Sequence, residues 1–296
     1  MSDGYETVTA RCLCGVARHQ LELAKADLPL RLSICHCHSC RHMTGTLGLT
    51  FIQLAADYAP APAVLANLTA FPFSKRLTQY FCSTCGTLML SHYWKDGDDR
   101  SKGEQWDAMT GTLEQADGIF ELQSHEFVAD TLDGGQADFL PSVNGKAISR
   151  WAGWPGKSEQ LPLYWTSPNR PSIRESRAEK VHAHCKCGGV QFWIARPSER
   201  SEQASCPWPD LIIPDHSTEA RPAPAAWWLC DGGKKFLAGV CACNSCRLDT
   251  GMEWMPWAFV PAIDITLDAE GDVPFSLPFS TLRAYTSSPH VIRWSY

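Results

Sequence analysis

The feature that most constrains this chain is a set of cysteine clusters that occurs twice in the same order. The first copy contains RCLCGVARHQLEL and then ICHCHSCRHMTG, and the second contains AHCKCGGVQFWI and then VCACNSCRLDTG. The two triplets match at all three cysteines, at the following arginine and at a Thr-Gly pair. Self-similarity of this kind predicts two tandem domains.

The repeat also predicts the domain boundaries. We expect a first domain over residues 1–165, a linker over 166–180 and a second copy over 181–296. The linker contains TSPNRPSIRESRAEK, which has prolines, serines and mixed charge without apolar periodicity. An insert near 197–226 separates the two cysteine strings of the second copy, and its prolines and scattered charges predict a surface loop.

Short runs of β-branched and aromatic residues recur in both copies and are bounded by Gly, Pro and Asp. They are VARHQLEL, LGLTFIQL and TLMLSHYW in the first copy, and GVQFWI, MPWAFV and IDITL in the second. Such runs predict strands, and long helical periodicity is absent. We therefore expect a mainly β, mainly antiparallel architecture organised around metal clusters.

The chain has 14 cysteines, and only Cys206 and Cys230 stand outside the clusters. Cysteines this close in sequence pair poorly as disulfides, whereas thiolates that converge on one metal ion need such spacing. We expect zinc at the clusters and free thiols at the two isolated positions.

Two of the cysteine pairs in the first copy can close a tetrahedral site. Cys12 and Cys14 are two residues apart, so on a strand they would point to one face and hold an ion without a turn. Cys82 and Cys85 would lie on a tight turn that Gly86 leaves with a positive φ. Together these four thiolates predict a structural zinc.

The triplet of the first copy, Cys35, Cys37 and Cys40, has no fourth cysteine left to it. Three protein ligands leave one position of a zinc ion open for water or a substrate thiol. Three thiolates make zinc a weaker Lewis acid toward water, while a bound thiol stays deprotonated. Sulfur chemistry therefore suits this centre better than hydrolysis.

Polar residues beside the triplets have alternative interpretations. His36, His38 or His42 can fill the fourth position and make the centre purely structural. We expect the rings of His36 and His38 to point away, toward the surface. Arg41 and Arg247 follow the last triplet cysteine of each copy. They either neutralise the anionic site, or hold a carboxylate of a glutathione-like ligand, or are ordinary surface arginines.

Composition narrows the class of partner. The chain has 26 Lys and Arg against 32 Asp and Glu, with a net charge of −6 and no basic run, so nucleic acid is not an expected partner. No apolar stretch approaches the ~20 residues that span a bilayer, and the first residues lack a signal-peptide pattern. We expect a cytoplasmic protein without a membrane partner.

The strings C-L-C-G, C-H-C-H-S-C-R with T-G, and F-C-S-T-C-G-T resemble the glutathione-dependent formaldehyde-activating enzyme family, which also includes centromere protein V. MTGTLE and SHEFVADTLDGG add to this resemblance. It implies two tandem zinc-containing β-tent domains. The second would be incomplete at its C-terminus, because the chain stops at Tyr296, where a second C-x-x-C pair should begin. The implied metal ligands are Cys12, Cys14, Cys82, Cys85, Cys35, Cys37, Cys40, Cys185, Cys187, Cys241, Cys243 and Cys246.

The resemblance implies a reaction that joins glutathione and formaldehyde to S-hydroxymethylglutathione, which is carbon–sulfur lyase chemistry. The triplets of both copies would be catalytic, zinc would be the cofactor and glutathione the co-substrate. A general acid is needed to protonate the product oxygen, and His36, His38 and water are the candidates. The alternative is a non-catalytic, zinc-stapled binding or scaffold protein like the centromere relative, although the negative charge disfavours chromatin as its partner.

Overall fold

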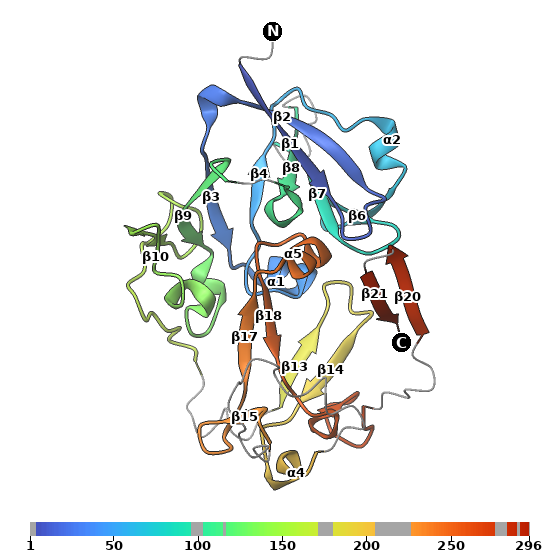
Figure 1. Cartoon of the computed structure of the whole chain (residues 1–296). Helices are drawn as coiled ribbons and strands as arrows, with labels where there is room; N and C mark the ends of the chain where they lie inside the picture. Colours follow the sequence, from blue (N-terminus) through green and yellow to red (C-terminus); the bar gives the residue numbers. More distant parts are fainter. Residues whose placement is uncertain are drawn as a thin grey trace, which may run out of the picture. The chain divides into compact units, whose positions relative to one another are not determined.

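The computed structural model describes residues 4–95, 103–114, 117–170, 180–204, 226–275, 283–288 and 291–295 (Figure 1). It is mainly β, as the sequence predicts. By contacts the described residues form two compact units. The first unit contains those of Met1–Arg170, Cys241–Met255 and Arg283–Ser295, and the second contains those of Pro171–Val240 and Pro256–Leu282. The second-copy triplet therefore lies in the first unit, together with the first copy.

An antiparallel five-stranded sheet is the largest element of the first unit. Its strands lie in the order β4-β8-β7-β6-β5. Their bounds are Phe51–Gln53 for β4, Leu68–Pro72 for β5, Leu77–Cys82 for β6, Leu88–Trp94 for β7 and Glu104–Met109 for β8. The predicted strand TLMLSHYW is thus confirmed as β7, whereas LGLTFIQL contributes only the three residues of β4 to the sheet.

A hairpin of β1 (Tyr5–Arg11) and β2 (Arg18–Ala24) packs its apolar side against this sheet. Along β2 exposed and buried residues alternate, with His19, Leu21 and Leu23 buried. That alternation is the period of a strand with one covered face. It confirms the strand predicted from VARHQLEL.

One sheet departs from the antiparallel prediction. β3 (Leu30–Cys35), β9 (Phe120–Glu126) and β12 (Ser149–Arg150) form a parallel sheet in the order β12-β9-β3. Parallel neighbours need a long crossover connection. The whole five-stranded sheet lies between β3 and β9 in sequence, so no local pattern signals this pairing.

Short elements complete the first unit. The α-helices are α1 (His38–Thr44), α2 (Pro62–Leu65) and α5 (Asn244–Thr250). The 3₁₀ turns are η1 (Lys25–Asp27), η3 (Thr110–Thr112), η4 (Val128–Asp130) and η5 (Gly135–Asp138). The remaining strands are β10 (Ser142–Val143), β11 (Lys146–Ala147), β20 (Arg283–Ser288) and β21 (Val291–Ser295), which pair as β10-β11 and β20-β21.

The second unit is built from short strands. A three-stranded sheet has the order β13-β14-β19, and β15 pairs with β16. The bounds are Val181–His184 for β13, Gln191–Ile194 for β14, Leu229–Cys230 for β15, Lys235–Phe236 for β16 and Ile265–Thr266 for β19. Helix α4 (Glu199–Glu202), the 3₁₀ turn η7 (Ala262–Asp264) and the paired strands β17 (Ala238–Cys241) and β18 (Met255–Ala258) complete the described elements.

Of the predicted surface insert near 197–226, the structure describes 197–204 and 226. The first of these ranges holds helix α4, and a capping box between Ser198 and Ser201 begins that helix. The remainder of the insert and most of the predicted linker lie outside the described residues. The domain boundaries stay predictions.

Three apolar clusters make the core of the first unit, one of them formed by Val128, Ala137 and Leu161. The other two contain cysteines. The larger one lies between the β1-β2 hairpin and the five-stranded sheet, and includes Leu21, Ile52 and Leu90. The smaller one surrounds the first triplet and includes Cys35 and Met252. The metal-site candidates therefore lie beside the best-packed parts of the chain.

No helix among the described residues is long and apolar enough to cross a membrane.

Candidate metal centres

Four cysteines of the first copy converge on one point. The sulfurs of Cys12, Cys14, Cys82 and Cys85 all lie within 4.8 Å of one another. Two of the distances are 3.4 Å, from Cys12 Sγ to Cys14 Sγ, and 3.7 Å, from Cys14 Sγ to Cys82 Sγ. Sulfurs at the corners of a tetrahedron with Zn–S bonds of ~2.3 Å lie ~3.8 Å apart. The spacing and the all-thiol donor set fit a structural zinc.

The local backbone explains this convergence and corrects one prediction. Cys12 and Cys14 do not lie on a strand; they lie in the turn between β1 and β2, which Gly15 leaves with φ of 80°. A turn lets backbone N–H groups reach the sulfurs, and Ala17 N–H donates to Cys12 Sγ at 3.3 Å. Gly86 has φ of 79°, as predicted for the turn after Cys85.

The triplet of the first copy forms where β3 meets α1. Cys35 ends β3, and Cys37 caps α1, where its sulfur accepts the Cys40 N–H at 3.3 Å. The three sulfurs lie within 4.8 Å of one another, with 3.7 Å between Cys35 and Cys40. No histidine nitrogen of the described residues joins this group.

The charges at the triplet are shared unevenly. Hydrogen bonds to Cys37 and Cys40, together with burial, raise the pKa of Cys35. Hydrogen bonds from Cys35 and Cys40 lower the pKa of Cys37, so the negative charge is concentrated there. Three sulfurs this close repel one another as thiolates, and a divalent cation would remove that conflict. The donor set therefore fits zinc with one position not supplied by the protein.

His36 is placed differently from the prediction. We expected a surface ring, but the residue is fully buried. Its Nε2 lies 2.9 Å from His125 Nδ1, and His125 Nε2–H donates to the Leu140 carbonyl at 2.9 Å. Because a carbonyl only accepts, His125 Nδ1 is the acceptor and His36 Nε2–H the donor. Burial lowers the pKa of His36 to about 3, which keeps its ring neutral.

This relay connects the triplet loop to β9 and to the segment after η5. A buried polar ring needs a partner inside the protein, and His125 provides it for His36. His38 is exposed, as predicted, and its ring lies 4.1 Å from that of His42.

Arg41 has two structural partners. Its Nε donates to the His36 carbonyl at 3.0 Å and its Nη2 to the Asp130 carbonyl at 2.9 Å. Asp130 in turn accepts the backbone N–H of His38 through its carboxylate at 3.1 Å. These bonds fasten the start of α1 to η4. A ligand-binding role for Arg41 stays a prediction.

A pocket of about 260 Å³ opens beside the triplet. Glu126 is the acid in its wall, and β3 pairs Glu126 with Cys35. Burial raises the pKa of the Glu126 carboxyl to about 7, and the Cys35 thiol donates a hydrogen bond to the Glu126 carboxylate. The pocket is lined by Leu30, Arg31, Leu32, Ser33, Phe51, Gln53, Glu126 and Trp154.

Sequence reasoning missed Glu126 as a site residue. The signal was present in the string SHEFVADTLDGG, where three polar residues in succession end a strand. On a strand, consecutive side chains alternate between faces. His125 therefore turns to His36 while its neighbour lines the pocket.

The clustered cysteines of the second copy are more exposed to solvent than those of the first copy. The sulfurs of Cys241, Cys243 and Cys246 lie within 4.8 Å of one another, but Cys243 is exposed. Cys185 and Cys187 lie 3.4 Å apart, and no third metal-binding side chain of the described residues joins them. The expectation of a half-made site stays a prediction.

The two isolated cysteines are Cys230 and Cys206. Cys230 is a free thiol whose sulfur lies 3.5 Å from the Lys235 carbonyl. Cys206 lies outside the described residues.

Comparison with known proteins adds one finding. Residues 7–130 match the family model of the glutathione-dependent formaldehyde-activating enzyme. The matched segment contains all seven cysteines of the first copy, the buried His36–His125 pair and Glu126. No curated protein matches the chain.

Proposed function

We propose that this chain, whose residues 7–130 match the family model of the glutathione-dependent formaldehyde-activating enzyme, joins a small thiol to a small aldehyde. Glutathione and formaldehyde are the proposed pair, which makes the reaction carbon–sulfur lyase chemistry. The observation that carries the proposal is a three-cysteine cluster next to a pocket: Glu126, a buried acid in the pocket wall, hydrogen-bonds the Cys35 thiol of that cluster. The family match supports the substrates, and the geometry supports the chemistry.

The seven cysteines of the first copy would divide four and three between two zinc ions. The four-cysteine site would stabilise the fold, and Cys35, Cys37 and Cys40 would hold the reactive ion. Zinc bound to three thiolates supplies an open position at which an exogenous thiol stays deprotonated at neutral pH. In the second copy, Cys241, Cys243 and Cys246 would hold a further ion. Cys185 and Cys187 would need ligands from outside the described residues.

The pocket beside the triplet would bind the substrates. Its volume of about 260 Å³ suits an aldehyde with part of a tripeptide thiol. Phe51 belongs both to the pocket wall and to the apolar cluster around the triplet, so it connects the two. Trp154 lines the pocket with an aromatic ring, and Gln53 with an amide. These side chains would hold the thiol and the carbonyl carbon in proximity.

Glu126 would move the proton. On binding, the substrate thiol gives its proton to the Glu126 carboxylate. The sulfur electron pair then forms the S–C bond, and the C=O π pair moves to oxygen. Glu126 returns the proton to that oxygen, so the carboxylate is regenerated and no other reactant is needed. Burial raises the pKa of Glu126 above its ordinary value, which favours a carboxylate that takes up a proton more readily than an exposed one.

An arginine would hold a carboxylate of the thiol. Arg31 lines the pocket and is exposed, so its guanidinium is available. Arg41 has Nε and Nη2 bound to carbonyls, so its part would be to place positive charge next to the three-thiolate centre. We therefore propose Arg31 as the ligand-binding arginine of this pocket.

A non-catalytic scaffold is the second candidate, and no specific observation favours it. A scaffold needs the four-cysteine site, but it has no use for a buried acid that hydrogen-bonds a thiol in the wall of a pocket. Keeping Glu126 there costs desolvation free energy. A proton-transferring role of Glu126 would explain why the protein keeps a buried carboxyl at this desolvation cost.

Exchange NMR with [¹³C]formaldehyde and glutathione tests the proposal. The zinc-loaded protein should raise the rate of adduct exchange above the spontaneous rate. Glu126→Gln should lower that acceleration by about 10²–10⁴-fold, as expected for a lost general acid. Glu22→Gln serves as the control and should leave the acceleration unchanged, since Glu22 is an exposed carboxyl on β2 outside this pocket. No acceleration by the wild-type protein would refute the proposed reaction.

A further inference from the structure

One segment of the second copy belongs to the first compact unit. Residues 241–255, here called the docking segment, contain the second triplet and α5 and pack against the first copy. Gly111 N–H donates to the Gly251 carbonyl at 3.0 Å, and Arg247 Nη2 lies 3.4 Å from the Leu113 carbonyl. The Arg247 side chain thus contacts the first copy, and its Nε lies 3.5 Å from Glu253 Oε2.

Two glycines allow this close approach. A Cβ on Gly251 would lie 2.1 Å from the Leu88 carbonyl oxygen, and a Cβ on Gly111 would lie 2.2 Å from the Met252 carbonyl oxygen. Both contacts are with backbone, which cannot move aside as a flexible side chain can. Gly251 also has φ of 80°, which favours glycine. The two backbones therefore meet as closely as neighbours in one domain.

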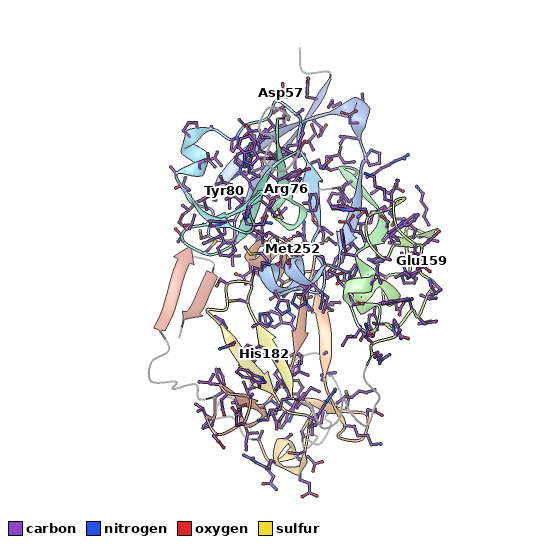
Figure 2. The ribbon with its side chains drawn as sticks, turned by 180° about the vertical axis from the view of Figure 1, so that it is seen from behind. Asp57, Arg76, Tyr80, Glu159, His182 and Met252 are labelled. Atoms are coloured by element: carbon purple, nitrogen blue, oxygen red, sulfur yellow. The ribbon has the colours of Figure 1, made fainter. Side chains whose placement is uncertain are left out.

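Met252 carries the contact to the first triplet. It is 1% exposed and belongs to the cluster of Cys35, Leu49, Leu88 and Met109. Cys37 and Cys40 pack against the same cluster. Figure 2 shows Met252 in the interior, among side chains of the first copy. A residue of the second copy thus forms part of the wall behind the first triplet.

The docking segment also reaches the four-cysteine site. Thr87 Oγ1 donates to the Leu248 carbonyl at 2.6 Å. The same oxygen accepts the N–H of Leu13, which lies between Cys12 and Cys14, and is 3.1 Å from Cys85 Sγ. One hydroxyl group therefore connects α5 to the turns that hold the four thiols.

The two triplets are not equivalent. His36, between the first two triplet cysteines, is buried in the relay with His125, whereas the residue at the same place in the second triplet is Ala242, which is exposed. In the docking segment, Leu248 of α5 and Met252, which follows that helix, are buried.

We propose that the docking segment is a built-in partner of the first copy, and that Met252 is a positioning residue that closes the wall of the first triplet. The second copy then serves the first one in addition to any chemistry of its own. The inference concerns packing and does not depend on which reaction the triplet performs. It predicts that damage to the docking segment exposes cysteines more than 200 positions earlier in the chain.

Cysteine alkylation of the zinc-loaded full chain, resolved by peptide mass spectrometry, tests this inference. Met252→Ala should raise the alkylation rate of Cys37 and Cys40 about tenfold or more, because it removes the packed side chain behind them. Met252→Leu keeps the volume and should restore protection to within about threefold. A purely local role of Met252 would change only Cys241, Cys243 and Cys246.

Glycine variants provide a second, matched test. Gly251→Ala should also expose Cys37 and Cys40. Gly145→Ala is the control, since Gly145 has φ of 75° but open space around its Cβ position. The Gly145→Ala variant therefore has an alanine at a positive φ, as Gly251→Ala does, but its Cβ does not clash with neighbouring backbone. Equal alkylation rates in the two glycine variants, or unchanged protection of Cys37 in Met252→Ala, would overturn the inference.

Discussion

The relay of His36 and His125 allows a quantitative prediction about the first triplet. His125→Phe preserves an aromatic ring of similar size but removes both hydrogen bonds of the relay. The His36 Nε2–H then has no acceptor in a fully buried position, and the Leu140 carbonyl loses its donor. A buried donor without a partner costs about 1–3 kcal/mol, and the carbonyl, which is partly exposed, adds less. We expect the free energy of unfolding to fall by about 2–3 kcal/mol.

His19 offers a matched control for this variant. It is also a buried histidine, but neither of its ring nitrogens has a hydrogen-bond partner among the described residues. Burial lowers the pKa of His19 to about 4, so the ring is neutral. His19→Phe removes two unsatisfied polar atoms and should leave the free energy of unfolding unchanged or raise it.

Urea unfolding, followed by tryptophan fluorescence on the zinc-loaded protein, measures both variants. Because His36 lies between two triplet cysteines, His125→Phe should also speed zinc loss to a chelator, whereas His19→Phe should not. The relay would have no such role if the two variants had equal unfolding free energies, or if His125→Phe retained zinc like the wild type.

Three further predictions concern other parts of the molecule. Cys82→Ser should unfold the first copy, because it opens a four-thiolate site that can contribute on the order of 10 kcal/mol to folding, whereas Cys37→Ser should leave the first copy folded and inactive. Circular dichroism measures the folding of each variant, and the exchange assay measures its activity. Equal loss of folding in both variants would contradict the division of the cysteines into a structural and a reactive site. Burial raises the pKa of Asp107 to about 7, so its folded-state pKa lies above its unfolded value; the stability this group provides is complete below pH ~4 and is lost as the pH rises toward 7. Asp107→Asn should therefore match the wild type at pH 4 and exceed it at pH 8 by up to about 4 kcal/mol in urea unfolding, and equal stability at pH 8 would refute the assignment. Metal stoichiometry after removal and return of zinc should give three ions per chain, two in the first copy and one at the second triplet, whereas a fourth ion bound through Cys185 and Cys187 would show that their site is complete.

The cysteine pattern predicted much of the candidate site, because metal ligands must be close in space and are often close in sequence. The Cys82–Cys85 turn and its positive-φ Gly86 follow from spacing alone. The Cys12–Cys14 pair was assigned to the wrong element, since two residues of one spacing fit either a strand face or a turn. The backbone distinguishes the two, through the positive φ of Gly15 and the Ala17 N–H that donates to Cys12 Sγ.

The residues that sequence reasoning missed depend on long-range packing. His36 turns inward to hydrogen-bond His125, which lies 89 positions later in the sequence. Thr87 hydrogen-bonds the Leu248 carbonyl, 161 positions later. Glu126 lines the pocket because β9 pairs in parallel with β3, and no local pattern predicts that pairing. The sequence repeat predicts separate domains, and it gives no sign that one segment of the second copy packs into the first unit.

The central claim is that the first triplet binds a substrate thiol, and cobalt substitution tests it most directly. The variant Cys243→Ser should be used, so that the second triplet does not contribute to the spectrum. On addition of glutathione, the thiolate-to-cobalt charge-transfer bands should change and saturate, and Cys37→Ser in the same background should lose that response. A spectrum that stays unchanged at saturating glutathione would contradict the account.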